Sequence, residues 1–217
     1  MPAPAEPALQ AVLLAGGTGS RLGGADKALL MRGRRTLLSR WVEELDRREI
    51  RTAVVGPAHL RAEVSEAVQL VQEKPAFSGP AAGILAGVRA LQHGSQSGED
   101  RSWTLVLAVD MASPGPLIEW LLAALEAAPA ADAVLPQDGS GRVQYLCALV
   151  STTWLQRRAQ ELGPGGLVNA RVRTLLDGLD GADTVVHPVI PAELAADIDT
   201  FEDALRWGID LPGAGAR

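Results

Sequence analysis

Short apolar runs alternate along the chain with longer segments in which apolar residues recur at helical spacing. This alternation is typical of parallel strands joined by crossover helices, and it predicts an α/β fold with a mostly parallel central sheet and helices on both faces. Strands are expected at residues 11–15, 51–55, 68–72, 103–109, 133–136, 143–150 and 184–189. Helices are expected at residues 36–48, 80–91, 114–128, 153–162, 168–176 and 200–207.

Every position from Trp103 to Val109 is apolar or a threonine, so this run is expected to be a central strand buried on both faces. It ends at Asp110. A sequence of 217 residues with no internal repeat is long enough for one domain with its own core, which we expect to span residues 11–210. Residues 1–10 are expected to be a flexible tail and residues 211–217 a second one.

The composition and net charge of the chain argue against several classes of protein. The net charge is -6, which argues against binding to nucleic acid or to an anionic membrane surface. The single cysteine, Cys147, cannot form an internal disulfide, and His59, His93 and His187 lack the spacing of zinc ligands. No export signal or long apolar span is apparent, so we expect a cytoplasmic protein.

The segment from Leu13 to Leu30, LLAGGTGSRLGGADKALL, contains the residues best suited to chemistry. A predicted strand runs directly into a loop with five glycines, whose backbone N–H groups can turn toward phosphate oxygens. Arg21 can bind two phosphate oxygens at once, and Lys27 supplies a mobile charge at the end of the loop. The five glycines are Gly16, Gly17, Gly19, Gly23 and Gly24.

Two familiar phosphate-binding motifs do not fit this loop. A Walker motif would require Lys and Ser/Thr after Gly24, where Ala25 and Asp26 stand. The dinucleotide fingerprint would require a third glycine at Leu22. A P-loop NTPase and a nicotinamide dehydrogenase are therefore disfavoured.

The same segment resembles the nucleotide-loop signature of the MobA-type nucleotidyltransferases, and most closely that of the molybdenum cofactor guanylyltransferases, written LAGG-x-[SAG]-x-R-[ML]-G-x-x-K-x-L with a short variable spacing. Three later segments follow in the order of that family: GPAAG at 79–83, AVDMASP at 108–114 and DIDTFEDAL at 197–205. The resemblance implies a Rossmann-like fold of the nucleotide-diphospho-sugar transferase type. It also implies a nucleotide-binding half at about 11–112 and an acceptor-binding half at about 113–210.

The resemblance further implies roles for single residues. Arg21, Lys27 and Asp110 would be catalytic, Asp110 would bind Mg²⁺, and Asp199 would contact the acceptor or the metal. A carboxylate at the end of a parallel strand suits Mg²⁺, although Asp110 could instead cap a turn or the next helix. Asp199 or Thr200 could likewise cap the last helix. The implied nucleotide-binding residues are Leu14, Ala15, Gly16, Gly17, Gly19, Arg21, Lys27, Gly79 and Asp110.

The implied activity is transfer of GMP from Mg-GTP to the terminal phosphate of the molybdenum–molybdopterin cofactor, with release of pyrophosphate. Alternatives within the fold are a cytidylyltransferase acting on the same cofactor and a sugar- or polyol-phosphate nucleotidylyltransferase. An alternative of another class is a regulatory protein that binds a nucleotide without catalysis. Because the cofactor is labile, proteins that hand it over directly are expected partners.

Several residues depart from the family or have a structural interpretation. Many members have an aspartate shortly before GP-x-AG, where this chain has Glu73 followed by Lys74. Cys147 lies in an apolar run and is expected to be a core residue rather than a nucleophile. His187 is also expected to be structural.

Overall fold

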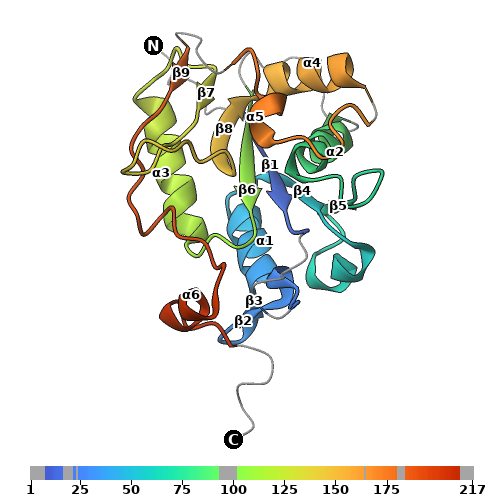
Figure 1. Cartoon of the computed structure of the whole chain (residues 1–217), viewed down its shortest axis with the longest axis vertical. Helices are drawn as coiled ribbons and strands as arrows, with labels where there is room; N and C mark the ends of the chain where they lie inside the picture. The colour runs from blue at the N-terminus through green and yellow to red at the C-terminus, as the bar shows by residue number, and fades with distance from the viewer. Residues whose placement is uncertain are drawn as a thin grey trace, which may run out of the picture.

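A computed structural model describes residues 8–16, 22, 24–92, 102–163, 165–179 and 184–210. Within these residues a seven-stranded sheet has the order β5-β4-β1-β6-β8-β7-β9 (Figure 1). Its strands are β1 (Ala8–Leu14), β4 (Arg51–Val55), β5 (Gln69–Val71), β6 (Ser102–Ala108), β7 (Ala133–Val134), β8 (Cys147–Ser151) and β9 (Val185–Val186).

The sheet is mostly parallel, as the sequence predicts. Strands β5, β4, β1 and β6 are parallel to one another, and β9 is parallel to β7. Strand β8 is antiparallel to both of its neighbours, β6 and β7. The reversal follows from the β7–β8 connection, which contains no crossover helix in the described chain, and a direct connection suits antiparallel strands.

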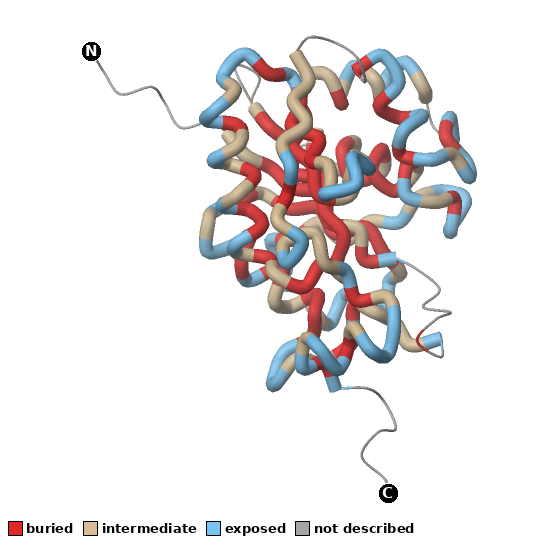
Figure 2. Tube along the Cα trace, turned by 60° about the vertical axis from the view of Figure 1, so that its left-hand side comes forward, coloured by how far each residue is buried: buried red, intermediate tan, exposed pale blue. Residues whose placement is uncertain are grey.

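Helices cover both faces of the sheet and form two separate cores. One core contains the apolar faces of α1 and α3, and the other contains those of α2, α4 and α5. In Figure 2 the buried residues form the continuous centre of the molecule, with exposed segments around it. The helices are α1 (Leu37–Arg47), α2 (Pro80–Gln92), α3 (Pro114–Glu126), α4 (Thr152–Leu162), α5 (Val172–Leu175) and α6 (Phe201–Arg206).

Strand β1 is buried on both sides from Ala11 to Leu13, which explains why this stretch is apolar. Leu13 packs into the core under α1, and Val12 packs into the opposite core under α2. Helix α2 lies so close to β1 that a Cβ at Gly87 would come within 2.6 Å of Val12 Cγ1. A glycine is therefore needed where the helix crosses the first strand.

The structure corrects several predicted boundaries. The first strand begins at Ala8, inside the predicted N-terminal tail of residues 1–10. The strand predicted at 143–150 begins only at Cys147, while Val143 forms an isolated bridge with Gln137. The helix predicted at 168–176 is reduced to α5. The tail at 211–217 and the loop residues 93–101 lie outside the described chain.

Among the elements bounded by described residues, four short ones were not predicted from the sequence. They are the hairpin strands β2 (Met31–Arg32) and β3 (Arg35–Thr36), and the 3₁₀ helices η2 (Lys27–Leu29) and η3 (Ala58–Glu63). Each is too short to produce a hydrophobic period. Over the described residues, no helix has both the length and the apolar character required to cross a membrane.

Candidate active site

A cleft of about 540 Å³ opens at the carboxyl ends of β1, β4, β5 and β6. Because these strands are parallel, the residues that follow them meet at one edge of the sheet, which is where ligands bind in open α/β folds. Gly17, Gly19 and Arg21 lie outside the described residues. The other predicted site residues all line the cleft: Leu14, Ala15, Gly16, Lys27, Gly79, Asp110 and Asp199.

Backbone hydrogen bonds fix the start of the glycine-rich loop. The Ala15 N–H donates to the Val55 carbonyl at 2.8 Å, and the Val109 N–H donates to the Leu14 carbonyl at 2.9 Å. A Cβ at Gly56 would lie 3.3 Å from the Ala15 carbonyl oxygen and 2.8 Å from Leu60 Cδ1. The wall of the cleft beside Ala15 is therefore close-packed backbone that a side chain at position 56 would disturb.

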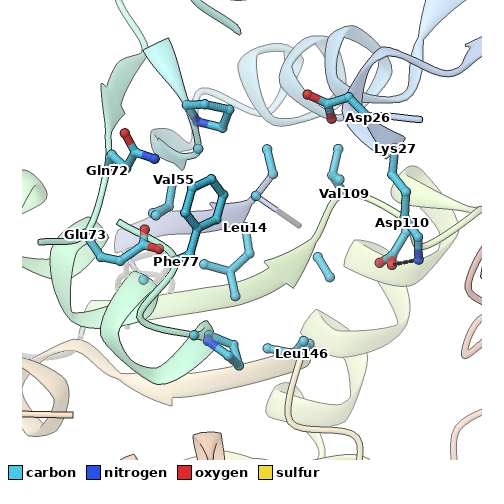
Figure 3. A pocket seen from close by; sticks show the side chains of 18 of the residues that line it. Leu14, Asp26, Lys27, Val55, Gln72, Glu73, Phe77, Val109, Asp110 and Leu146 are labelled. Carbon is cyan, nitrogen blue, oxygen red and sulfur yellow. Dashed lines mark hydrogen bonds and ion pairs between the residues drawn. The ribbon is translucent and has the colours of Figure 1, made fainter. Parts of the chain in front are cut away.

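Lys27 begins the short helix η2 at the rim of the cleft. Asp26 caps this helix by accepting a hydrogen bond from the Ala28 N–H at 3.0 Å, and its second carboxylate oxygen lies 2.8 Å from Nε2 of His59. The Lys27 ammonium donates to Asp110 Oδ2 at 2.8 Å and also to Asp199 Oδ1. Figure 3 shows Lys27 and Asp110 pointing toward one another at one end of the cleft.

The segment before α6 brings Asp199 beside Asp110. The Ile198 N–H donates to the Asp110 carbonyl at 3.0 Å, and Met111 forms an antiparallel bridge with Asp197. This pairing joins two segments that the sequence alone could not relate. The third charged residue, Lys27, reaches both from the loop after β1.

Neither Asp110 nor Asp199 is the N-cap of a helix. Ser113 stands at the N-cap of α3, and Thr200 caps α6 by accepting from the Asp203 N–H at 3.2 Å. Asp203 completes a capping box by accepting from the Thr200 N–H at 2.9 Å. Asp110 and Asp199 instead share the ammonium of Lys27.

Electrostatics in this cluster favour a charged lysine. Burial alone would lower the pKa of Lys27, but the charges of Asp110 and Asp199 and their hydrogen bonds outweigh it and raise that pKa. Burial, reinforced by the negative charges of Asp199 and Asp110, raises the pKa of Asp197. The cluster therefore holds three carboxyl groups around one ammonium.

The two carboxylates nearest Lys27 suit a magnesium ion that is also bound by substrate. Mg²⁺ in phosphoryl-transfer sites is usually held by one or two carboxylates together with phosphate oxygens and water. Asp110 and Asp199 supply this kind of donor set at one point of the cleft. Across the described ranges, no group of three or more His, Cys, Asp or Glu residues could by itself hold a metal ion.

The cleft also contains Gln72, Glu73 and Phe77, which were not among the predicted site residues. In the sequence, Glu73 and Lys74 stand where many family members have a Glu-Asp pair, with Lys74 at the position of the aspartate. The structure places Glu73 in the cleft, whereas Lys74 lines a separate open hollow beside Arg89. The acidic side chain is therefore present in the cleft next to the GPAAG segment.

Cys147 and His187 do not line the cleft. The thiol of Cys147 is only 1% exposed, and burial raises its pKa to about 12. Nδ1 of His187 lies 2.8 Å from the Leu135 carbonyl oxygen. Both observations agree with the expectation of structural roles.

The mostly parallel sheet has a glycine-rich sequence after its first strand, and a lysine and two aspartates meet at its carboxyl edge. These features define an α/β protein of the nucleotide-binding class. Residues 11–182 match the MobA-like NTP transferase domain, and the chain belongs to this family. The resemblance identified in the sequence is thus confirmed.

Relatives identified by sequence agree with this assignment. The chain is 31% identical over 185 residues to a molybdenum cofactor guanylyltransferase of Pseudomonas putida, covering 83% of this chain and 91% of that protein. It is 38% identical over 95 residues to the protein of that name from Burkholderia cenocepacia, a match that covers 42% of this chain and only 46% of the relative's length.

Among solved structures, the fold is similar to molybdopterin-guanine dinucleotide biosynthesis protein A from Archaeoglobus fulgidus, with a TM-score of 0.62 and 23% identity over 92% of this chain and 97% of that one. It is also similar to Rv0371c from Mycobacterium tuberculosis, with a TM-score of 0.63 and 19% identity over 93% and 98% of the two chains. These similarities confirm the predicted fold class.

Proposed function

We propose that this protein transfers GMP from GTP to the terminal phosphate of the molybdenum–molybdopterin cofactor and releases pyrophosphate. The observation that carries the proposal is the meeting of Lys27, Asp110 and Asp199 in one cleft, at the end of a family-specific glycine-rich loop. The relative from Pseudomonas putida, which matches over most of its length, supports the same reaction.

The reaction requires little covalent help from the protein. An oxygen of the acceptor phosphate attacks the α-phosphorus of GTP, the bond between the α-phosphorus and its bridging oxygen breaks, and pyrophosphate leaves. The protein must hold the attacking and leaving oxygens in line and meet the developing charge with cations already in place. Lys27 and the predicted Arg21 supply positive charge for the phosphates.

Asp110 and Asp199 would hold Mg²⁺ in this account. The ion, when bound, neutralises phosphate charge and fixes the geometry of the phosphate oxygens. The ammonium of Lys27 contacts both carboxylates. It would therefore lie beside the metal and could bind a neighbouring phosphate group.

The choice of guanine is supported by Glu73. A carboxylate can accept two hydrogen bonds side by side, and guanine offers two adjacent donors, its N1–H and its exocyclic amino group. Cytosine offers only its amino group as a donor on that edge. Glu73 lines the same cleft as Lys27, so one nucleotide could contact both residues.

The cytoplasmic location and direct transfer of the cofactor between proteins belong to the same proposal. GTP is a cytoplasmic nucleotide, and a labile cofactor is best passed on without release. A pull-down that recovers no protein of molybdenum-cofactor metabolism would argue against handover while leaving the transfer reaction intact.

The proposal is tested by measuring pyrophosphate release with Mg²⁺ and molybdenum cofactor, using GTP, CTP, ATP and UTP in parallel. Release with GTP alone is the expected result. Release with CTP alone would overturn the assignment of the base. No release with any nucleotide, from folded protein that binds GTP, would overturn the assignment of the reaction.

A further inference from the structure

At the edge of the cleft, the apolar residue Phe77 is exposed and the polar residue beside it is buried, which is the opposite of the usual pattern. Its large apolar side chain is 67% exposed, whereas the small polar residue that follows it, Ser78, is 2% exposed. Folding normally buries the aromatic ring and leaves the hydroxyl in water. An aromatic side chain kept in solvent beside a ligand cleft is typical of a surface that a ligand covers.

The turn that holds Phe77 outward is fixed by its neighbours. The buried hydroxyl of Ser78 donates to the Pro75 carbonyl, and the Ser78 carbonyl accepts from the Asn169 N–H at 2.7 Å. Phe77 itself has a φ of 62°, in the left-handed region that bulky side chains rarely adopt. Gly79, with a φ of 88°, then leads into α2. The backbone conformation and hydrogen bonds of this turn therefore keep the ring exposed.

The surroundings of Phe77 suit a flat, partly apolar ligand group. Among the described residues that line the cleft, Phe77 is the only aromatic one, and the apolar side chains of Leu14 and Val55 line the cleft with it. Figure 3 shows the ring at the end of the cleft that also holds Glu73, away from Lys27 at the other end. The charged end of a nucleotide would therefore lie far from the ring, and its base would lie near it.

We propose that Phe77 is the stacking platform for the guanine base of GTP. This inference rests on the proposed function and adds a positioning role: the ring covers one face of the base while Glu73 meets its edge. Stacking of a base on an aromatic side chain commonly changes affinity by about tenfold. Phe77 would thus set how tightly the base is held and would leave binding of the phosphates unchanged.

The experiment compares the dissociation constants of Mg-GTP, of Mg-tripolyphosphate, which is a probe without a base, and of the molybdenum cofactor, by titration calorimetry. Phe77→Ala should weaken GTP binding about tenfold and leave tripolyphosphate binding unchanged, and Phe77→Tyr should restore GTP binding. The chain contains two phenylalanines, so Phe201→Ala is a matched control. Phe201 is 52% exposed, does not line the cleft and should not affect the affinity for GTP.

Three results would overturn the proposal. Equal weakening of GTP and tripolyphosphate would mean that the substitution disturbs the turn rather than the base. Unchanged binding of GTP would exclude stacking, and weaker binding of the molybdenum cofactor alone would assign the ring to the acceptor. Because wild-type transfer activity is measured separately, failure of this inference is distinguishable from failure of the proposed function.

Discussion

The Nζ atom of Lys27 lies 2.8 Å from Oδ2 of Asp110, although 83 positions separate the two residues. Lys27 comes from the loop after β1, and Asp110 comes from the end of β6, the neighbouring parallel strand. Parallel pairing of these strands therefore brings together a cation for phosphates and a carboxylate for a metal. The contact between Lys27 and Asp110 is the basis of the proposed phosphate and metal site.

Loss of either member of this pair should nearly abolish transfer. Lys27→Met and Asp110→Asn are each expected to lower turnover by about a hundredfold or more, because each removes a charge that the transition state requires. Turnover is measured by pyrophosphate release, with circular dichroism to verify folding. Lys74→Met is the matched control, since Lys74 is the other lysine of the chain and lies outside the cleft. Near-normal turnover in a folded Lys27 or Asp110 variant would contradict the assigned role.

Asp197 should make the stability of the protein depend on pH. Its pKa is raised in the folded state, so its ionised form weakens the fold, and the stability present below the unfolded pKa is lost as the pH rises through the folded pKa. Measured without metal, the melting temperature of Asp197→Asn should therefore rise relative to that of the wild type over the pH interval that begins at the ordinary pKa of an aspartate and ends at the raised pKa of Asp197. A difference in melting temperature that stays constant over this interval would contradict the direction assigned to this pKa.

Gly87 should be intolerant of a methyl group. In Gly87→Ala the new Cβ would lie 2.6 Å from Cγ1 and 2.9 Å from Cγ2 of Val12, a stiff side chain in a doubly buried strand. Although alanine favours a helix, overpacking should lower the free energy of unfolding by about 1–2 kcal/mol. Urea denaturation measures the change.

Gly139→Ala is the control for this substitution, because nothing lies within 4 Å of a Cβ there. It should leave the free energy of unfolding within about 0.5 kcal/mol of the wild type. Equal stability of the Gly87 and Gly139 variants would mean that α2 does not approach β1 as described.

Cys147 should be chemically inert in the native protein. Burial raises the pKa of its thiol to about 12, so very little thiolate is present near neutral pH. A thiol-specific reagent should label the protein only after denaturation, and Cys147→Ala should retain transfer activity. Rapid labelling of the native protein, or loss of activity in a folded variant, would indicate a chemical role that the structure does not support.

The sequence predicted the parallel half of the sheet well because β1, β4 and β6 are largely buried. Burial explains both the apolar run of β6 and the helical spacing of apolar residues in α1. The antiparallel direction of β8 could not be predicted, since strand direction depends on the connection and not on the apolar pattern. The shorter second-half elements have too few residues for a periodic signal.

The candidate site was partly predictable for a similar reason. Glycines, Lys27 and Asp110 stand in a contiguous motif or directly after a strong strand, where the sequence carries the signal. The contact of Lys27 with Asp199 depends on pairing between distant segments, and no local pattern indicates it. Phe77 and Glu73 enter the cleft through the turn before α2, which the sequence shows only as a loop rich in Pro and Gly.

The most direct test of the central claim follows the phosphorus atoms of GTP during the reaction. Wild-type protein is incubated with Mg²⁺, molybdenum cofactor and GTP labelled either at the α-phosphate or at the γ-phosphate. Attack at the α-phosphorus predicts that the α-label moves into the molybdenum-containing product and that the γ-label appears in pyrophosphate. Recovery of the γ-label as inorganic phosphate, or of the α-label only in free guanine nucleotides, would contradict nucleotidyl transfer.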